Sequence, residues 1–270
     1  MGTTNQNMND TDNKTRTLQT VSTALEVLTE LKENDTLGVT ELATRLDISK
    51  SSAHAHLATL EANEMVINHD GTYELAVNLF TFGQYVREQN LLYQHGKSQV
   101  DKLADETSQY VHIVTEENGW GINLYQIKGE TRVGGDYQQN KPQRRDHLHY
   151  TASGKAILAA LPADRAREII ESNGLPQRTS NTITSERDLF EELESIRERG
   201  YSYNDEEEIE GFRAVGTAVR GPGGEVLGSL SISGPTSFMQ GDRYEKTIPD
   251  RLINAANLIE VNLNMSESDK

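Results

Sequence analysis

The sequence predicts an α+β protein with two domains, a small helical domain that ends in a β-hairpin and a larger domain built on an antiparallel sheet. Two observations support this prediction. From residue 21 to residue 75, apolar residues recur at helical spacing and are followed by two short β-prone runs. Beyond residue 99, helical and alternating patterns are mixed, which is typical of an antiparallel sheet flanked by helices.

The length and composition are those of a folded protein without a membrane-spanning segment. The chain has 270 residues, enough for two domains, and no cysteine, which suits a reducing compartment. Residues 1–15 are polar and lack the apolar core of a signal peptide, so we expect a disordered N-terminal arm there. No apolar run is long enough to cross a membrane. We therefore expect a cytoplasmic protein with no membrane partner.

Residues 16–78 are expected to form the first domain, which contains three helices. The first helix carries an apolar stripe of Val21, Ala24, Leu25, Leu28 and Leu31. The second and third helices share a core, to which the second contributes Leu42, Ala43 and Leu46, and the third contributes Ala53, Leu57 and Leu60.

The signals between these helices indicate a helix-turn-helix. Thr40 and Ser49 stand where a side-chain oxygen would cap the helix that follows, and Asp47-Ile48 leaves only a tight turn. Residues 65–75 hold two short β-prone runs around an Asp-Gly turn. Three helices and a hairpin form a winged helix-turn-helix, an arrangement that binds DNA.

The third helix is the expected contact with double-stranded DNA. Each helical residue advances by about 100°, so the face opposite the core would enter the major groove and contact phosphates and base edges. The alternative is a small helical interaction domain that binds no nucleic acid. His54 and His56 cannot chelate one metal ion, because positions i and i+2 point to nearly opposite sides. The predicted DNA-contacting residues are Ser49, Lys50, Ser51, Ser52, His54 and Ala55.

The charge of the chain opposes DNA binding at first sight. The net charge is −16, and residues 1–82 hold five basic and twelve acidic residues. The segment from Ile48 to Leu60, however, has one lysine and no carboxylate. An acidic, lysine-poor surface is typical of proteins from concentrated salt, where screening is strong and counterion release contributes little. We therefore expect a salt-loving host and recognition through base contacts, DNA shape and ordered water.

Residues 79–98 are predicted to form an amphipathic linker helix. Leu79, Phe82 and Val86 recur at helical spacing, and the pattern continues toward Leu92 and Tyr93. The apolar face of this helix is either internal core or the seam of a homodimer. DNA-binding domains of this type pair to match two half-sites, so a palindromic operator is expected.

Residues 99–265 are expected to form the second domain, with a tail at 266–270. Two helices are predicted around residues 100–104 and at 153–161, the second stopped by Pro162. A third begins at the capping Ser185 and ends at Gly200, and its core face is Leu189, Leu193 and Ile196. The last helix runs through Leu252, Ala256, Ile259 and Leu263. Strands are predicted at 110–115, 121–127, 213–220 and 226–233, the last two joined by the turn at 221–225.

Two stretches of the second domain resemble the IclR family of transcriptional regulators. The run from Leu148 to Pro162 contains Thr-Ala-Ser-Gly-Lys-Ala and is similar to the family signature. The stretch from Gly200 to Val219, followed by Leu227 to Pro235, resembles the effector-binding region. With the winged helix, the resemblance covers roughly residues 18 to 264. It implies a GAF-like effector domain, dimers or dimers of dimers, and a regulator whose operator binding a small metabolite controls.

The resemblance also implies an effector pocket, and the residues add their own argument. Ser231 and Ser233, at i and i+2 of one strand, put two hydroxyls on one face. Amides at the start of the helix around Gly154-Lys155 suit a carboxylate, so an organic or sugar acid is expected. The alternative is that both serines satisfy backbone groups at a strand end. The pocket residues carried over by position are Ala152, Ser153, Asn204, Ala214, Ser231 and Ser233.

The sequence departs from the family pattern at two positions. Asn204 stands where relatives that bind small acids can place an acidic side chain, so the effector cannot be copied from them. Ala55 stands where the recognition helix often carries an arginine, so the strongest contact to guanine is missing.

Parts of the sequence are also compatible with other functions. His147 and His149 form a His-x-His pair that could bind a metal, or could donate hydrogen bonds at the pocket entrance. Ser153, Lys155 and His149 could form a hydrolase site, although Ser153 and Lys155 point nearly oppositely on a helix and no nucleophile elbow is present. A sensor acting through protein contacts is a further alternative. We expect no enzyme activity, no metal and no cofactor.

Overall fold

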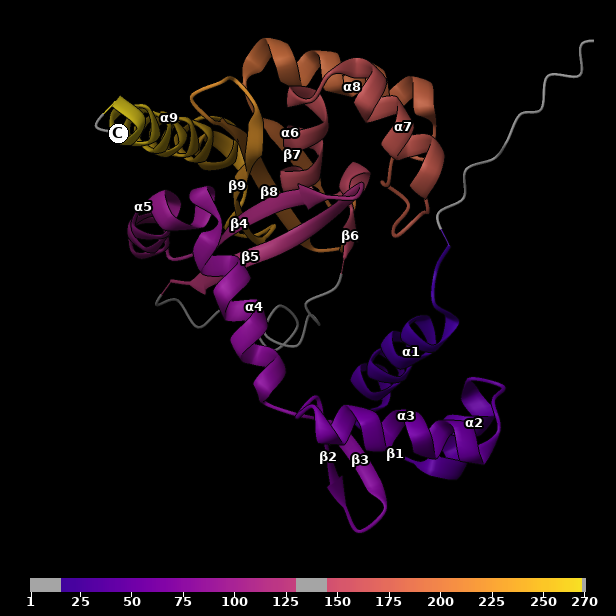
Figure 1. Cartoon of the computed structure of the whole chain (residues 1–270). Helices are drawn as coiled ribbons and strands as arrows, with labels where there is room; N and C mark the ends of the chain where they lie inside the picture. Colours follow the sequence, from indigo (N-terminus) through magenta and orange to yellow (C-terminus); the bar gives the residue numbers. More distant parts are fainter. Residues whose placement is uncertain (1–15, 130–144, 269–270) are drawn as a thin grey trace, which may run out of the picture. The chain divides into compact units, whose positions relative to one another are not determined.

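The computed structural model describes residues 16–129 and 145–268, so the predicted arm at 1–15 lies outside the described residues. The chain divides into two compact units between Tyr85 and Val86, each with its own core (Figure 1). Among the described residues, no helix is both long and apolar enough to cross a membrane.

The first unit is a winged helix-turn-helix. Its helices are α1 (Gln19–Asn34), α2 (Val39–Arg45) and α3 (Lys50–Ala62), and its strands are β1 (Thr36–Gly38), β2 (Val66–His69) and β3 (Thr72–Leu75). The antiparallel sheet has the order β1-β3-β2. The predicted Asp70-Gly71 turn joins β2 and β3, and both residues have positive φ, as this type of hairpin turn requires. Strand β1 was not predicted, because three residues are too short to show a period.

Two details of the first unit differ from the prediction. On α1, Leu31 is buried and Ala24 and Leu28 pack against the core as predicted, but Val21 and Leu25 are exposed. Val27 and Thr23 are buried in addition, so the buried face of the helix is rotated from the predicted one. Thr40 does not cap α2, because the chain passes directly from β1 into a helix that begins at Val39, after Gly38.

The predicted linker helix at 79–98 is two helices. Helix α4 spans Asn78–Gln89, and α5 spans Leu91–Thr107. Asn90 separates them, and its side-chain oxygen accepts a hydrogen bond from the amide of Tyr93 at 3.1 Å. Leu92 lies on α5 and is buried in the core of the second unit, whereas Phe82 and Val86 lie on α4. The apolar residues predicted to share one face of a single helix are therefore divided between two helices.

The second unit is built on a six-stranded antiparallel sheet with the order β6-β5-β4-β9-β8-β7. The strands are β4 (Tyr110–Glu117), β5 (Trp120–Lys128), β6 (Asp146–His147), β7 (Ser202–Asp205), β8 (Phe212–Arg220) and β9 (Val226–Pro235). The helices besides α5 are α6 (Ala152–Ala160), α7 (Ala163–Asn173), α8 (Glu186–Arg199) and α9 (Ile248–Ser268), with a 3₁₀ turn at Leu148–Tyr150 and a π turn at Arg243–Thr247.

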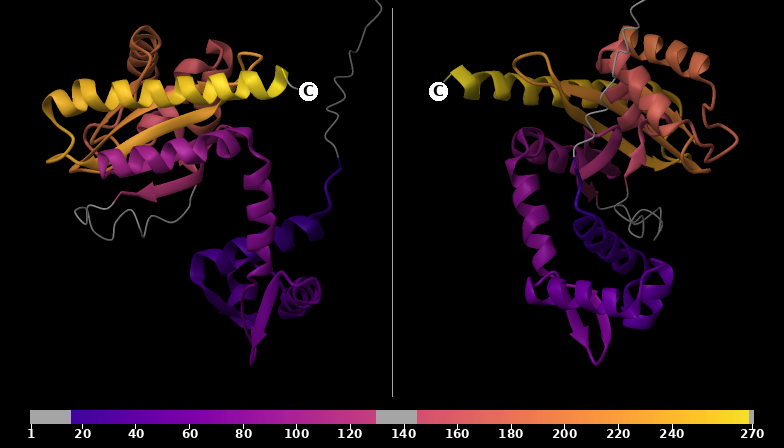
Figure 2. Two further views of the ribbon diagram at one scale, coloured as in Figure 1. Left: turned by 90° about the vertical axis from the view of Figure 1, so that its left-hand side faces the viewer. Right: turned by 45° about the vertical axis from the view of Figure 1, so that its right-hand side comes forward.

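Helices cover both faces of this sheet. Helices α5 and α9 run together along one face, where Val111, Ile232 and Ile259 belong to the main core (Figure 2). Helix α6 packs on the other face, and α7 and α8 lie outside it around a second core that includes Ile157 and Leu193. Strands β6 and β7 and helix α7 were not predicted. Helix α9 continues to Ser268, past the predicted start of the tail.

Candidate functional site

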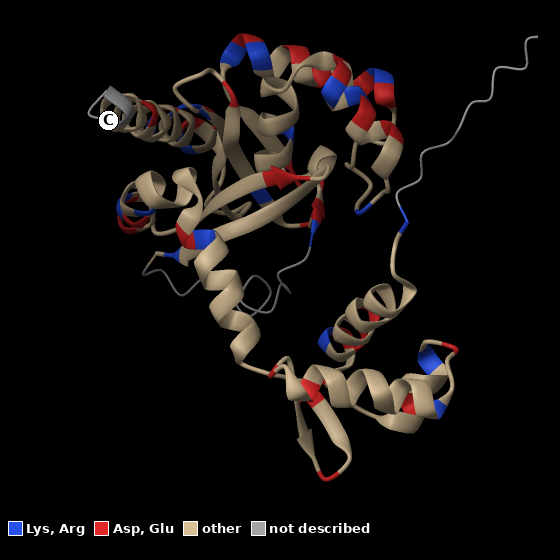
Figure 3. Cartoon of the chain, in the orientation of Figure 1, with Lys and Arg blue, Asp and Glu red and all other residues tan. Residues whose placement is uncertain are grey.

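Helix α3 presents the predicted DNA-contacting residues to solvent. The hydroxyl of Ser49 accepts a hydrogen bond from the amide of Ser52 at 3.1 Å, so the helix begins as its sequence predicts. Ala53, Leu57 and Leu60 are buried. In Figure 3 most of α3 carries no charge. Ser49, Lys50, Ser51, His54 and Ala55 are exposed, and Ser52 is half-buried.

The second unit contains a cavity between the N-terminus of α6 and the sheet, with a solvent-accessible volume of about 60 Å³. All six residues that the sequence placed in the pocket line it, namely Ala152, Ser153, Asn204, Ala214, Ser231 and Ser233. Sequence reasoning missed the others, which are His112, Val114, Gly121, Asn123, Asp146, Thr151 and Glu208.

The strand register explains why these residues meet. Asn204 pairs with Ala214, which pairs with Ser233, and this row crosses β7, β8 and β9. In the next row, Ser231 pairs with His112 on β4. Paired residues in antiparallel strands share a face. His112 was therefore missed because only the sheet order reveals that β4 lies beside β9.

Side-chain hydrogen bonds connect the serines to the cavity wall. The hydroxyl of Ser153 donates to that of Ser231 at 2.8 Å. The Nε2 atom of His112 lies 3.0 Å from the hydroxyl of Ser233. Both Ser231 and Ser233 therefore contact side chains, which the alternative of serines that satisfy only backbone groups does not explain.

Asn204 shapes the cavity through the main chain. Its Nδ2 atom donates to the carbonyl of Tyr150 at 2.9 Å, and its Oδ1 atom accepts from the amide of Glu207 at 2.9 Å. The side chain is 4% exposed. It thus ties the turn after β7 to the segment before α6, a role that an acidic side chain could not fill, because it has no donor for the Tyr150 carbonyl.

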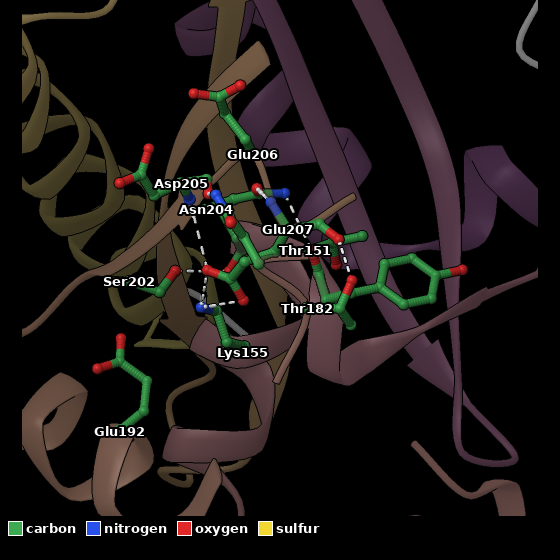
Figure 4. Close-up of polar contacts among 12 residues, drawn as sticks. Thr151, Lys155, Thr182, Glu192, Ser202, Asn204, Asp205, Glu206 and Glu207 are labelled. Carbon is green, nitrogen blue, oxygen red and sulfur yellow. Dashed lines mark hydrogen bonds and ion pairs between the residues drawn. The ribbon is translucent and has the colours of Figure 1, made fainter. Parts of the chain in front are cut away.

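A buried ion pair lies behind this wall (Figure 4). The Nζ atom of Lys155 lies 2.5 Å and 2.7 Å from the two carboxylate oxygens of Glu207, and both side chains are almost fully buried. The hydroxyl of Thr182 donates to the carbonyl of Glu207 at 2.6 Å. Burial raises the pKa of the Glu207 carboxyl, and the charge of Lys155 opposes that rise. The pair therefore fastens α6 to the 204–208 turn.

The close approach of α6 to the sheet requires a glycine on β8. A Cβ atom at Gly216 would lie 2.7 Å from the carbonyl carbon and oxygen of Ala152. The hydroxyl of Ser202 donates to the same oxygen at 2.6 Å. The first turn of α6 is thereby held against β7 and β8, and the amide of Gly154 in this turn donates to the hydroxyl of Thr151 at 2.9 Å.

Neither His147 nor His149 is among the residues that line the cavity, although Asp146, next to His147, is. His149 is 1% exposed, and its Nε2 atom lies 3.1 Å from the carbonyl of Pro176. Burial lowers the pKa of His149 to about 4. The rings of His147 and His149 are 5.6 Å apart. Within residues 16–129 and 145–268, no group of three potential ligands that could hold a metal ion is found.

The hydrolase alternative has no support from the geometry. Ser153 donates to Ser231, Lys155 binds Glu207, and His149 contacts the carbonyl of Pro176. A nucleophile needs a base within hydrogen-bond reach, and these three side chains have three different partners.

Comparison with known proteins identifies both units. Residues 20–67 match the IclR helix-turn-helix domain, and residues 83–261 match the bacterial transcriptional regulator IclR C-terminal domain. The probable HTH-type transcriptional regulator ArcR of Halobacterium salinarum is 36% identical over 249 residues, which cover 92% of this chain and 95% of that protein.

Two solved structures share the fold. The Thermotoga maritima IclR is 27% identical with a TM-score of 0.73, over 91% of this chain and 99% of that one. An IclR homolog from Microbacterium hydrocarbonoxydans, solved in complex with 4-hydroxybenzoate, is 19% identical with a TM-score of 0.74, over 91% and 99%. These matches, together with the helix-turn-helix and the C-terminal domain described above, show that the chain belongs to the IclR family of transcriptional regulators.

Proposed function

We propose that a small organic or sugar acid binds in the cavity at the N-terminus of α6 and controls operator binding. The observation that carries this proposal is that Ser153, at the N-terminus of α6, lines one cavity together with Ser231 and Ser233 of β9. Hydroxyl and amide donors complement a carboxylate. The relative solved with 4-hydroxybenzoate, itself a carboxylate, supports this class of ligand.

Thermal stabilisation by a panel of such acids tests the site. A ligand that binds the folded state raises the unfolding temperature. We expect an acid that stabilises the wild type to lose most of its effect in Ser231→Ala and Ser233→Ala. Ser195→Ala, an exposed serine on α8, is the matched control and should keep the full effect. Full stabilisation in both cavity variants would reject this assignment.

We further propose that α3 enters the major groove through Ser49, Lys50, Ser51, Ser52, His54 and Ala55. Gel shifts of the upstream DNA in high salt, with Lys50→Ala and His54→Ala, test this contact. Both variants should weaken binding, whereas Lys102→Ala, an exposed lysine on α5, should not. Equal affinity of all three variants for DNA would exclude α3 as the recognition helix. A loss of DNA affinity when the effector is added to the wild type would support control of DNA binding by the effector.

A homodimer on a palindromic operator is the proposed assembly. The apolar residues exposed on α1 and α4 form patches of a kind that marks interaction surfaces. Phe82→Glu should convert a dimer to a monomer in light scattering and weaken DNA binding, while Glu88→Gln, an exposed change on the same helix, should not. A wild-type chain that is monomeric at micromolar concentration would reject the dimer. The exposed apolar residues are Leu18, Val21 and Leu25, next to and on α1, and Phe80, Phe82, Tyr85 and Val86 on α4.

A further inference from the structure

We propose a second ligand site in the second unit, a groove at the C-terminal end of α6 that binds an amphipathic carboxylate, meaning a molecule with an apolar tail and one carboxylate. The groove has a volume of about 870 Å³. Residues of α6, α8, β8 and β9, and of the turn between the two strands, line it. It shares no lining residue with the cavity at the other end of α6.

The floor of the groove suits an apolar tail. Ala156 and Ala159 come from α6, Ile196 from α8, Ala218 from β8 and Val226 from β9. The three alanines leave the space that larger side chains would fill. An apolar tail placed there is removed from water, which favours binding.

Two arginines at one end of the groove suit the carboxylate. The Nε atom of Arg197 donates to the carbonyl of Ala159 at 2.7 Å, and an Nη atom of Arg220 donates to that of Ala160 at 2.9 Å. Since these carbonyls belong to adjacent residues, both guanidinium groups lie at the same end of α6. Planar guanidinium groups bind carboxylates with paired hydrogen bonds.

One donor of Arg197 is left without an acceptor. Its Nη1 atom donates to the carboxylate of Glu194 on the same helix at 2.5 Å, whereas its Nη2 atom is buried and has no hydrogen-bond partner among the described residues. The guanidinium group of Arg220 donates to main-chain carbonyls, those of Ala160 and Gly224. Buried donors are nearly always satisfied. The groove is lined by these two arginines and by one acidic residue, Glu225, in a chain with a net charge of −16.

Calorimetric titration of the full chain with sodium octanoate tests the proposal. Octanol, which lacks the charge, and sodium acetate, which lacks the tail, are matched probes and should bind at least about tenfold more weakly than octanoate. Arg197→Gln should weaken octanoate binding by about tenfold or more, and Arg197→Lys, which keeps the charge, should restore part of it. Arg187→Gln, on the exposed side of α8, should have no effect.

Two further variants keep the test decisive. Ala218→Phe should fill the groove from β8 and abolish octanoate binding, even if Arg197→Gln does not fold. Ser231→Ala, in the other cavity, should leave octanoate binding unchanged, which separates this proposal from the proposed effector site. Absence of octanoate binding, equal binding of octanol, loss of binding in Ser231→Ala, or full binding in Ala218→Phe would each overturn the proposal.

Discussion

Lys155 and Glu207 are the residues on which the wall of the cavity depends. Both charges are buried and satisfy each other, so removing one leaves the other unpaired away from water. Lys155→Met should lower the free energy of unfolding by about 3–5 kcal/mol, measured by urea denaturation. The double variant Lys155→Met/Glu207→Leu should recover much of this loss, and a double variant less stable than Lys155→Met would contradict a pairwise role.

His149 predicts a dependence of stability on pH. Burial lowers its pKa to about 4 in the folded state, against 6.5 as the ordinary value. As the pH falls below 6.5, the unfolded chain binds a proton that the folded chain does not, so stability is lost between pH 6.5 and 4. His149→Gln should flatten the profile of unfolding free energy in this window. An unchanged slope in the variant would assign the pH dependence to other groups.

Among the elements, the packing of α6 on β8 determines the shape of the cavity. Gly216→Ala should displace the N-terminus of α6, because the new methyl group would meet the backbone of Ala152. We expect a loss of about 1–3 kcal/mol in unfolding free energy and weaker binding of the effector. Gly83→Ala is the control, since nothing lies within 4 Å of its Cβ position on α4, and it should stabilise that helix by up to about 1 kcal/mol. A fully stable Gly216→Ala variant would show that α6 adjusts without cost.

Some elements could be predicted from local signals and others could not. Helix α8 has Ser185 as its N-cap, Gly200 with positive φ at its C-terminal end, and a buried face that includes Leu193. Each of these signals lies within the helix or directly next to it in the sequence. Strand β7, by contrast, has four residues and is stabilised by pairing with β8. The break between α4 and α5 depends on Asn90 and on the burial of Leu92 in a different core, which periodicity alone does not reveal.

At the scale of the whole molecule, the division into two units predicts independent folding. Each unit has its own hydrophobic core, so residues 86–270 should fold without the first unit. This fragment should unfold cooperatively, keep its stabilisation by the effector, and fail to bind DNA. Circular dichroism and calorimetry would measure both transitions in the full chain and one in the fragment. An unfolded fragment would mean that the first unit is needed for the core of the second.

The sequence by itself determined the helix-turn-helix, the resemblance to the family, and six of the thirteen residues that line the cavity. The helix-turn-helix follows from caps and periods in neighbouring residues, and the six cavity residues follow from motifs that resemble those of the family. Only the tertiary structure decided that His112 faces the serines, that Lys155 pairs with Glu207, and that a groove lies at the far end of α6. Each of these depends on strand order and packing, which bring together segments that are distant in the sequence. The pattern of residues along the chain does not show which of these segments will meet.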